Sequence, residues 1–304
     1  MTELIALTKR NVKLYFKDKG RFFSSLITPM ILLVLYATFL KKIYDDSFRS
    51  ALAAAGATVS DTVLNGCVGG QLVSALLAVS CVTVAFCSSL GMIHDKVTGA
   101  RADLTVTPVK PGILGLSYYI STLISTLIVT YAACAVCFVY LAAVGWYLSV
   151  ADVFLVLLDV FLLTMFGTAL ASCVSFFLST DGQASAVGTV VSAGYGFICG
   201  AYMPMSNFPT GLQKFLSLLP GTYGTSLLHN HAMRGVFEKM SSEGFPPEVV
   251  DAIRDSVDCN IHFMASESVV SIGGMYAILA VSTAVFIFLY VALNLLMAKK
   301  KIKK

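Results

Sequence analysis

Two long apolar runs, separated by a short charged segment, constrain the fold of this chain more than any other feature. The runs cover residues 69–93 and 113–145, and a helix needs about 20 apolar residues to cross the hydrocarbon core of a bilayer. The 304-residue chain is 57% hydrophobic and only 12% charged, whereas an ordinary soluble domain is about 25% charged. This pattern predicts an all-α membrane protein.

Six apolar segments are long enough to be transmembrane helices. We expect them at residues 22–43, 68–93, 115–147, 150–178, 184–203 and 268–297, which together form one transmembrane domain over residues 22–304. No internal repeat is visible in the sequence, which argues against the secondary transporters that are built from duplicated halves.

Residues 1–21 predict an N-terminal amphipathic helix. One helical face carries Ile5, Val12, Tyr15 and Phe16, and another carries Lys9, Lys13 and Lys17. Such a helix is interfacial, with its lysines on the anionic headgroups of membrane lipid. An anchor that only sets the orientation of the chain is an equally compatible interpretation.

The longer polar stretches predict segments on the outer side of the membrane. Residues 44–67 predict a polar loop, and residues 204–267 predict an extracellular segment. Within the latter, we expect two short helices at 212–219 and 223–236, separated by Pro220 and Gly221. Each is too short to span, so we expect them to be re-entrant or interfacial helices before the last span.

The distribution of basic residues predicts the orientation. Fourteen of the 21 Lys and Arg residues precede the first span, lie in residues 94–110 or end the chain, and the other seven are spread over longer loops. By the positive-inside rule, both termini and residues 94–110 are cytoplasmic. We therefore expect a multi-pass protein of a bacterial plasma membrane.

Residues 94–110 form a compact segment of mixed charge between the second and third spans. The segment is too short to be a domain and too polar to lie in lipid, so it must lie at the membrane surface. We interpret it as a coupling segment, which a cytosolic partner holds in order to move the spans. Its charged side chains can pair with complementary groups and fix the register of that contact. A solvated loop that only stabilises the topology is the alternative.

Few other residues suggest a transport, metal-binding or catalytic role. Asp159 lies within the fourth expected span, where a carboxylate must face protein or water, so it is a possible intramembrane polar site with either a structural or a transport role. Four outer residues could form a metal site, but their spacing matches no known pattern: His229, His231, Cys259 and His262. Cys134 and Cys137 form a CxxC in mid-span, with no charge nearby to activate a thiol. We expect no metal and no catalytic residue.

The order of several short motifs resembles that of ABC-2 type permeases, the membrane subunits of ATP-binding-cassette exporters. The motifs are Arg10-Asn11, Lys17-Asp18-Lys19, Asp95-Lys96-Val97-Thr98-Gly99, Asp103-Leu104, Thr107-Pro108, Pro209, Leu218-Leu219-Pro220 and Tyr223. The resemblance covers nearly the whole chain and depends on order and spacing. Residues 238–267 make a longer outer segment than the simplest members are expected to have.

The resemblance implies that the coupling segment is a helix that docks on a cytosolic ATP-binding-cassette ATPase. The candidate coupling residues are His94, Asp95, Lys96, Gly99, Arg101, Asp103, Thr107, Pro108 and Lys110. The chain itself has no GxxxxGK[ST] phosphate-binding motif, so we expect ATP and Mg to bind the partner and no cofactor to bind this chain. By family analogy, a homodimer or a pair with a paralogous permease encloses a path lined by the second and fifth spans.

We therefore expect a permease that exports a hydrophobic or amphipathic substrate such as a drug, a lipid or a lipopeptide. A polysaccharide exporter is the first alternative. An ATP-independent channel or secondary transporter is the second, with Asp159 as its candidate ion site. An intramembrane enzyme would need a nucleophile with a base, or metal ligands, at membrane depth. We expect neither enzyme activity nor a nucleic-acid partner.

Overall fold

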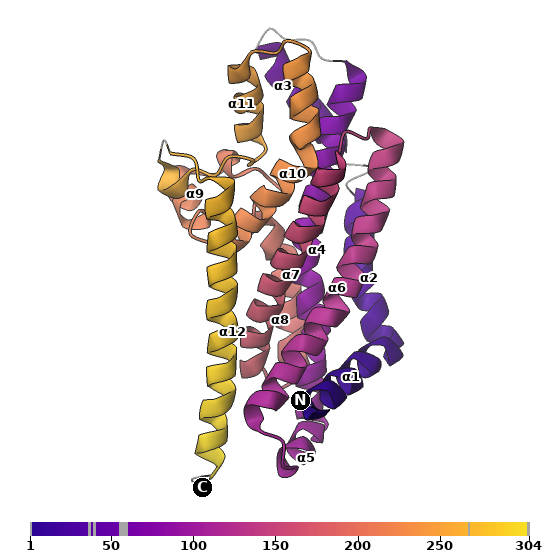
Figure 1. The fold of residues 1–304 in the computed structure, drawn as a ribbon, viewed down its shortest axis with the longest axis vertical. Helices are drawn as coiled ribbons and strands as arrows, with labels where there is room; N and C mark the ends of the chain where they lie inside the picture. The colour runs from indigo at the N-terminus through magenta and orange to yellow at the C-terminus, as the bar shows by residue number, and fades with distance from the viewer. Residues whose placement is uncertain (1, 36–37, 39–40, 55–59, 267, 303–304) are drawn as a thin grey trace.

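The structure is a computed structural model that describes residues 2–35, 38, 41–54, 60–266 and 268–302. These residues fold into helices, and the described ranges contain no strand beyond an isolated bridge between His262 and Val269. Long helices run side by side along the longest axis, α1 (Thr2–Lys17) lies across their lower end, and both termini lie in that lower half (Figure 1). The predicted all-α class is confirmed.

Four described helices are long and apolar enough to cross a membrane. They are α4 (Asp61–Val97), α6 (Pro111–Val144), α7 (Val150–Phe177) and residues Ile272–Met297 of α12 (Ile272–Ile302). They correspond to the second, third, fourth and sixth expected spans.

The first and fifth expected spans are not among these four, so the count of six stays a prediction. The described part of the first is α2 (Lys19–Leu35), which has 17 residues, and residues 36, 37, 39 and 40 lie outside the described ranges. The fifth corresponds to α8 (Asp181–Ile198), whose apolar character is diluted by Asp181, Gln183 and four glycines.

The centre of the bundle is α4, which packs against α2, α6, α7, α8 and α10 (Pro220–Ser242). In its most apolar stretch 83% of the residues are buried, whereas the corresponding share in α12 is 17%. Gly70 allows α10 to approach closely, since a side chain at this position would meet Met233 and the backbone of Ala232. Because α4 is central, a movement of its last turn, which leads into residues 94–110, would reach most of the bundle.

Of the predictions about the outer segments, the loop was wrong, and the two short helices were right in number but not in length. The expected loop 44–67 contains α3 (Lys41–Ala54) and the first turns of α4. The expected short helices 212–219 and 223–236 are α9 (Thr210–Leu216) and the 23-residue helix α10. Pro220 starts α10 at a first-turn position, where its missing N–H leaves no helical hydrogen bond unmade. A re-entrant path for these helices is not confirmed.

The N-terminal helix α1 is present as predicted, but its apolar residues do not share one buried face. Tyr15 is buried, while Ile5 is 65% exposed. The cause is that α1 packs against α6, so that Ile5 and Val12 border an open apolar groove together with Ile120 and Ile124. The described outer segment also contains α11 (Pro247–Ser256), which packs against α10 and α3.

The junction between α6 and α7 is fixed by a capping box and an ion pair. Ser149 caps α7 by accepting a hydrogen bond from the Asp152 backbone, and the Asp152 carboxylate accepts one from the Ser149 backbone in return. Arg234 of α10 then pairs with Asp152 at 2.8 Å. This ion pair connects α10 to the hairpin of α6 and α7.

Candidate functional site

The coupling segment consists of the last turn of α4, the short helix α5 (Ala100–Val106) and a link to α6. Gly99 joins α4 to α5 with a φ of 83°, a left-handed conformation that favours glycine. Lys110 precedes Pro111, which starts α6 at its first turn. The segment thus joins the lower ends of α4 and α6, near α1, as Figure 1 shows.

Asp95 is turned inward and is only 6% exposed. Its carboxylate accepts hydrogen bonds from Arg10 of α1 and from the Tyr118 hydroxyl of α6, both at 2.7 Å. The ion pair with Arg10 balances the charge that burial would otherwise leave uncompensated. Asp95 therefore joins α4 to α1 and α6, and its carboxylate is already occupied within the chain.

Lys96 caps the C-terminal end of α7. Its ammonium donates to the carbonyls of Ser175, Phe176 and Leu178 at 2.9, 2.7 and 2.7 Å. The last carbonyls of a helix have no intrahelical partner and carry partial negative charge, so a cation stabilises them. Lys96 thereby joins α4 to α7 through all three of its donors.

Arg101 connects α5 to the last helix. It donates to the Asn294 side-chain oxygen of α12 at 3.1 Å. Asn294 in turn donates to the carbonyl of Tyr290 and faces Gly115 of α6 so closely that a side chain there would clash. The coupling segment thus contacts α1, α6, α7 and α12 through three charged side chains.

Most of the remaining candidate residues are exposed, so a partner could reach this part of the segment. The exposed ones are His94, Asp103, Thr107, Pro108 and Lys110. No residue of α5 is buried. Two apolar side chains that the charge-based prediction missed are also exposed, Val97 at 47% and Val106 at 88%. We call His94, Val97, Asp103, Val106, Thr107, Pro108 and Lys110 the coupling surface.

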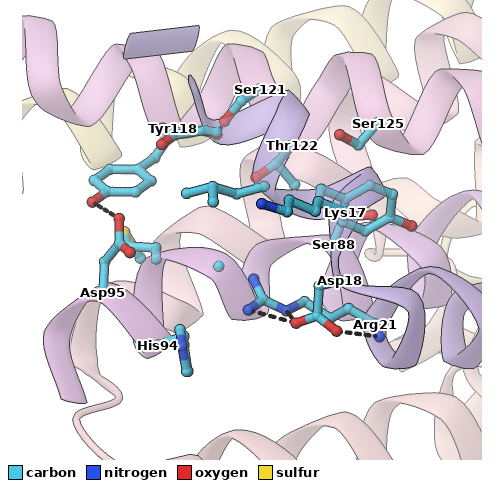
Figure 2. A pocket seen from close by; sticks show the side chains of 15 residues that line it. Lys17, Asp18, Arg21, Ser88, His94, Asp95, Tyr118, Ser121, Thr122 and Ser125 are labelled. Atoms are coloured by element: carbon cyan, nitrogen blue, oxygen red, sulfur yellow. Dashed lines mark hydrogen bonds and ion pairs between the residues drawn. The ribbon is translucent and has the colours of Figure 1, made fainter. Parts of the chain in front are cut away.

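A polar cavity of about 360 Å³ lies beside the coupling segment, between the α1–α2 junction, α4 and α6. Figure 2 shows two internal pairs at its edge, Asp95 with Tyr118 and Asp18 with Arg21. The pKa of Asp18 is lowered, first because the Arg21 backbone N–H donates to its carboxylate and further because of the Arg21 charge. We call this space the cytoplasmic cavity, after the side of the membrane that the sequence predicts for it.

Asp159 belongs to a buried network that joins three helices. Its carboxylate is 2.6 Å from Nδ1 of His231 on α10 and accepts a hydrogen bond of 2.6 Å from Tyr276 on α12. The rings of His231 and Tyr276 are stacked, 6.2 Å apart. The sequence indicated that Asp159 needs a protein partner, but His231 and Tyr276 are too distant in sequence to be recognised as those partners.

The histidines of residues 204–267 do not form the metal site that was considered. His231 binds Asp159, and His262 lies 3.6 Å from Asp255. His229 is fully buried, and its ring interacts with the Val257 backbone, with no shorter hydrogen bond among the described residues. Burial lowers the pKa of His229 to about 4, so its ring is neutral at physiological pH. Within the described ranges, no three His, Cys, Asp or Glu residues are placed to hold a metal ion.

Four helices long and apolar enough to cross a membrane define a multi-pass membrane protein, and its coupling segment contacts several of the helices. The family model of the ABC-2 type transporter matches residues 2–231. The chain belongs to this family and is a permease subunit of an ABC transporter, a family whose members pair with an ATP-binding-cassette ATPase. No curated protein matches the chain.

Proposed function

We propose that this chain exports a hydrophobic or amphipathic substrate, driven by ATP hydrolysis on a separate ATPase subunit that docks on the coupling surface. One observation carries the proposal. Asp95, Lys96 and Arg101 connect the coupling segment to α1, α6, α7 and α12. A displacement of the segment by a partner would therefore be transmitted to four helices as a unit.

The docking contact itself is assigned to the side chains that the fold leaves exposed. Val97 and Val106 supply apolar contact area, and Asp103 and Lys110 supply charges at the rim. Apolar centres with charged rims are typical of protein interfaces. This assignment divides the predicted coupling residues into an outward group that binds the ATPase and an inward group that transmits its movement.

The substrate path is proposed to run between two permease chains, either two copies of this one or this one with a paralogue. Most of α4 is buried within its own bundle, but Phe86, Cys87 and Leu90 share an open groove of about 500 Å³ with α8. Ser185, Thr189 and Ser192 add hydroxyls to a wall that is otherwise apolar. A mainly apolar wall with a few hydroxyls suits a hydrophobic or amphipathic substrate.

The test is ATP-dependent transport in vesicles that contain the chain and its ATPase. The variant Asp103→Lys with Val106→Glu changes only exposed side chains, so we expect normal insertion and yield but at least about tenfold slower transport. The matched control is Thr62→Lys, an exposed residue at the opposite end of α4. Unchanged transport in the double variant would contradict docking at this surface.

A further inference from the structure

The side chains that line the cytoplasmic cavity offer more hydrogen-bond donors than the contacts within the protein use. Its volume of about 360 Å³ is at the lower end of the range for small-molecule sites. Both carboxylates at its edge are already paired, Asp95 with Arg10 and Asp18 with Arg21. Lys17 also lines the cavity, and no carboxylate in the described residues forms an ion pair with it. The unpaired charge of the cavity is thus positive.

The opposite wall of the cavity consists of hydroxyl groups on α4 and α6. They belong to Ser88, Ser121, Thr122 and Ser125. Ser88 is only 6% exposed, and its hydroxyl makes no hydrogen bond of ordinary length among the described residues; its neighbour is the Tyr15 hydroxyl, which binds Ser25. Buried hydroxyls nearly always have a partner. A ligand oxygen in the cavity would supply the missing one.

Figure 2 shows how these groups are arranged. The Lys17 side chain extends into the cavity, between the Asp18–Arg21 pair and the α6 wall that carries Thr122. A cation and several hydroxyl donors that converge from three helices suit an anion with several acceptor oxygens, of which phosphate is the commonest.

The cavity is also adjacent to apolar surface. Leu14 lines it and is 42% exposed. On α2, which follows directly, Phe23, Ile27 and Met30 are between 53% and 60% exposed. An acyl chain attached to a bound phosphate would thus find an apolar surface that faces lipid.

We propose that the cytoplasmic cavity binds the phosphate headgroup of a membrane amphiphile, with Lys17 as the principal charge and Ser88 as a hydroxyl partner. This inference rests on the proposed export function in one respect, namely that the bound amphiphile is the transported substrate. It makes the proposed substrate class more specific, from any amphipathic molecule to an anionic, phosphate-bearing one.

The test measures binding of dodecyl phosphate to the purified chain in maltoside detergent, without ATPase or nucleotide. We expect saturable binding that Lys17→Gln weakens by about tenfold, as for the loss of one charged hydrogen bond. Ser88→Ala is expected to weaken it by a smaller factor. The control Lys13→Gln removes a lysine one turn earlier on α1 that does not line the cavity, and it should bind within about twofold of wild type.

Two results of this measurement would overturn the site. One is a failure of dodecyl phosphate to saturate the wild type. The other is equally weakened binding in Lys17→Gln and Lys13→Gln, which would indicate general attraction to the basic helix. Equal affinity for inorganic phosphate would overturn the preference for an amphiphile.

A second arm separates transported substrate from resident lipid. Addition of the ATPase and ATP should release bound dodecyl phosphate if the cavity holds cargo, and full retention would contradict that role. Since the first arm uses neither ATPase nor ATP, it reports on the site even if the proposed export function fails.

Discussion

Asp258 gives the chain a pH-dependent stability that one substitution should remove. The side chain is 5% exposed in the outer segment, and both of its oxygens accept a hydrogen bond from the Met205 backbone N–H, at 2.8 and 3.0 Å. No cation forms an ion pair with it among the described residues. Burial raises the pKa of Asp258 to about 7, and the Met205 hydrogen bond opposes this only in part.

The sign and size of the effect follow from proton linkage. The unfolded chain loses the Asp258 proton near pH 3.8, whereas the fold retains it to about pH 7. Between these values the folded state binds one more proton, so the free energy of unfolding falls as pH rises and levels off above pH 7. A shift of about three pKa units corresponds to about 4 kcal/mol, an upper value because the buried site can relax.

Asp258→Asn tests this reasoning. Asparagine keeps an oxygen for Met205 and tolerates the φ of 56° at this position. Thermal unfolding of the purified protein should show equal stability near pH 4 and a higher Tm for the variant at pH 8, by on the order of 5 °C or more. Asp251→Asn, at an exposed position of α11, is the control and should follow wild type. A variant that loses stability with pH as steeply as wild type would refute the account.

Three further substitutions test contacts between helices. Lys96→Met should lower the free energy of unfolding by about 2 to 4 kcal/mol, since three α7 carbonyls lose a charged donor; equal thermal stability would contradict this. Asp159→Asn keeps an acceptor for Tyr276, so we expect normal assembly and retained transport, and loss of transport at normal yield would show a direct role. Gly235→Ala should sharply reduce the yield of folded protein, because a methyl group there would clash with the Tyr147 carbonyl, and unchanged yield would show that α10 can shift.

Local sequence signals predicted much of the fold because the spans depend on local composition. The apolar runs predicted α4, α6, α7 and α12, and the basic amphipathic pattern predicted α1. The bounds of α9 and α10 were harder to predict, since Pro220 looks like a helix breaker in the sequence but starts α10 in the structure. Whether a proline ends or begins a helix depends on the residues that pack around it, which are distant in sequence.

The candidate site was predicted as a segment but not residue by residue. Charge alone grouped Asp95, Lys96 and Arg101 with the docking residues, yet their partners lie on other helices. Nothing in the sequence near Lys96 indicates that the end of α7 lies next to it. Conversely, Val106 carries no charge and was overlooked, although it is among the most exposed apolar side chains of the protein. Which charges point inward is decided by tertiary packing.

The division of the segment into inward and outward groups also changes which experiment is informative. Reversing Asp95 would break its contacts with Arg10 and Tyr118, so lost transport would not distinguish poor folding from lost docking. Variants at Val106 or Asp103 avoid this ambiguity, because neither side chain is buried.

The most direct test of the central claim is purification of the native protein in mild detergent, with mass spectrometry of the proteins that accompany it. We predict a stoichiometric soluble subunit that carries a GxxxxGK[ST] motif and is lost when Val106 is changed to Glu, while the permease itself is recovered in normal amount. A permease that purifies without any ATPase, or one that keeps its ATPase despite the Val106→Glu change, would contradict docking at the coupling surface.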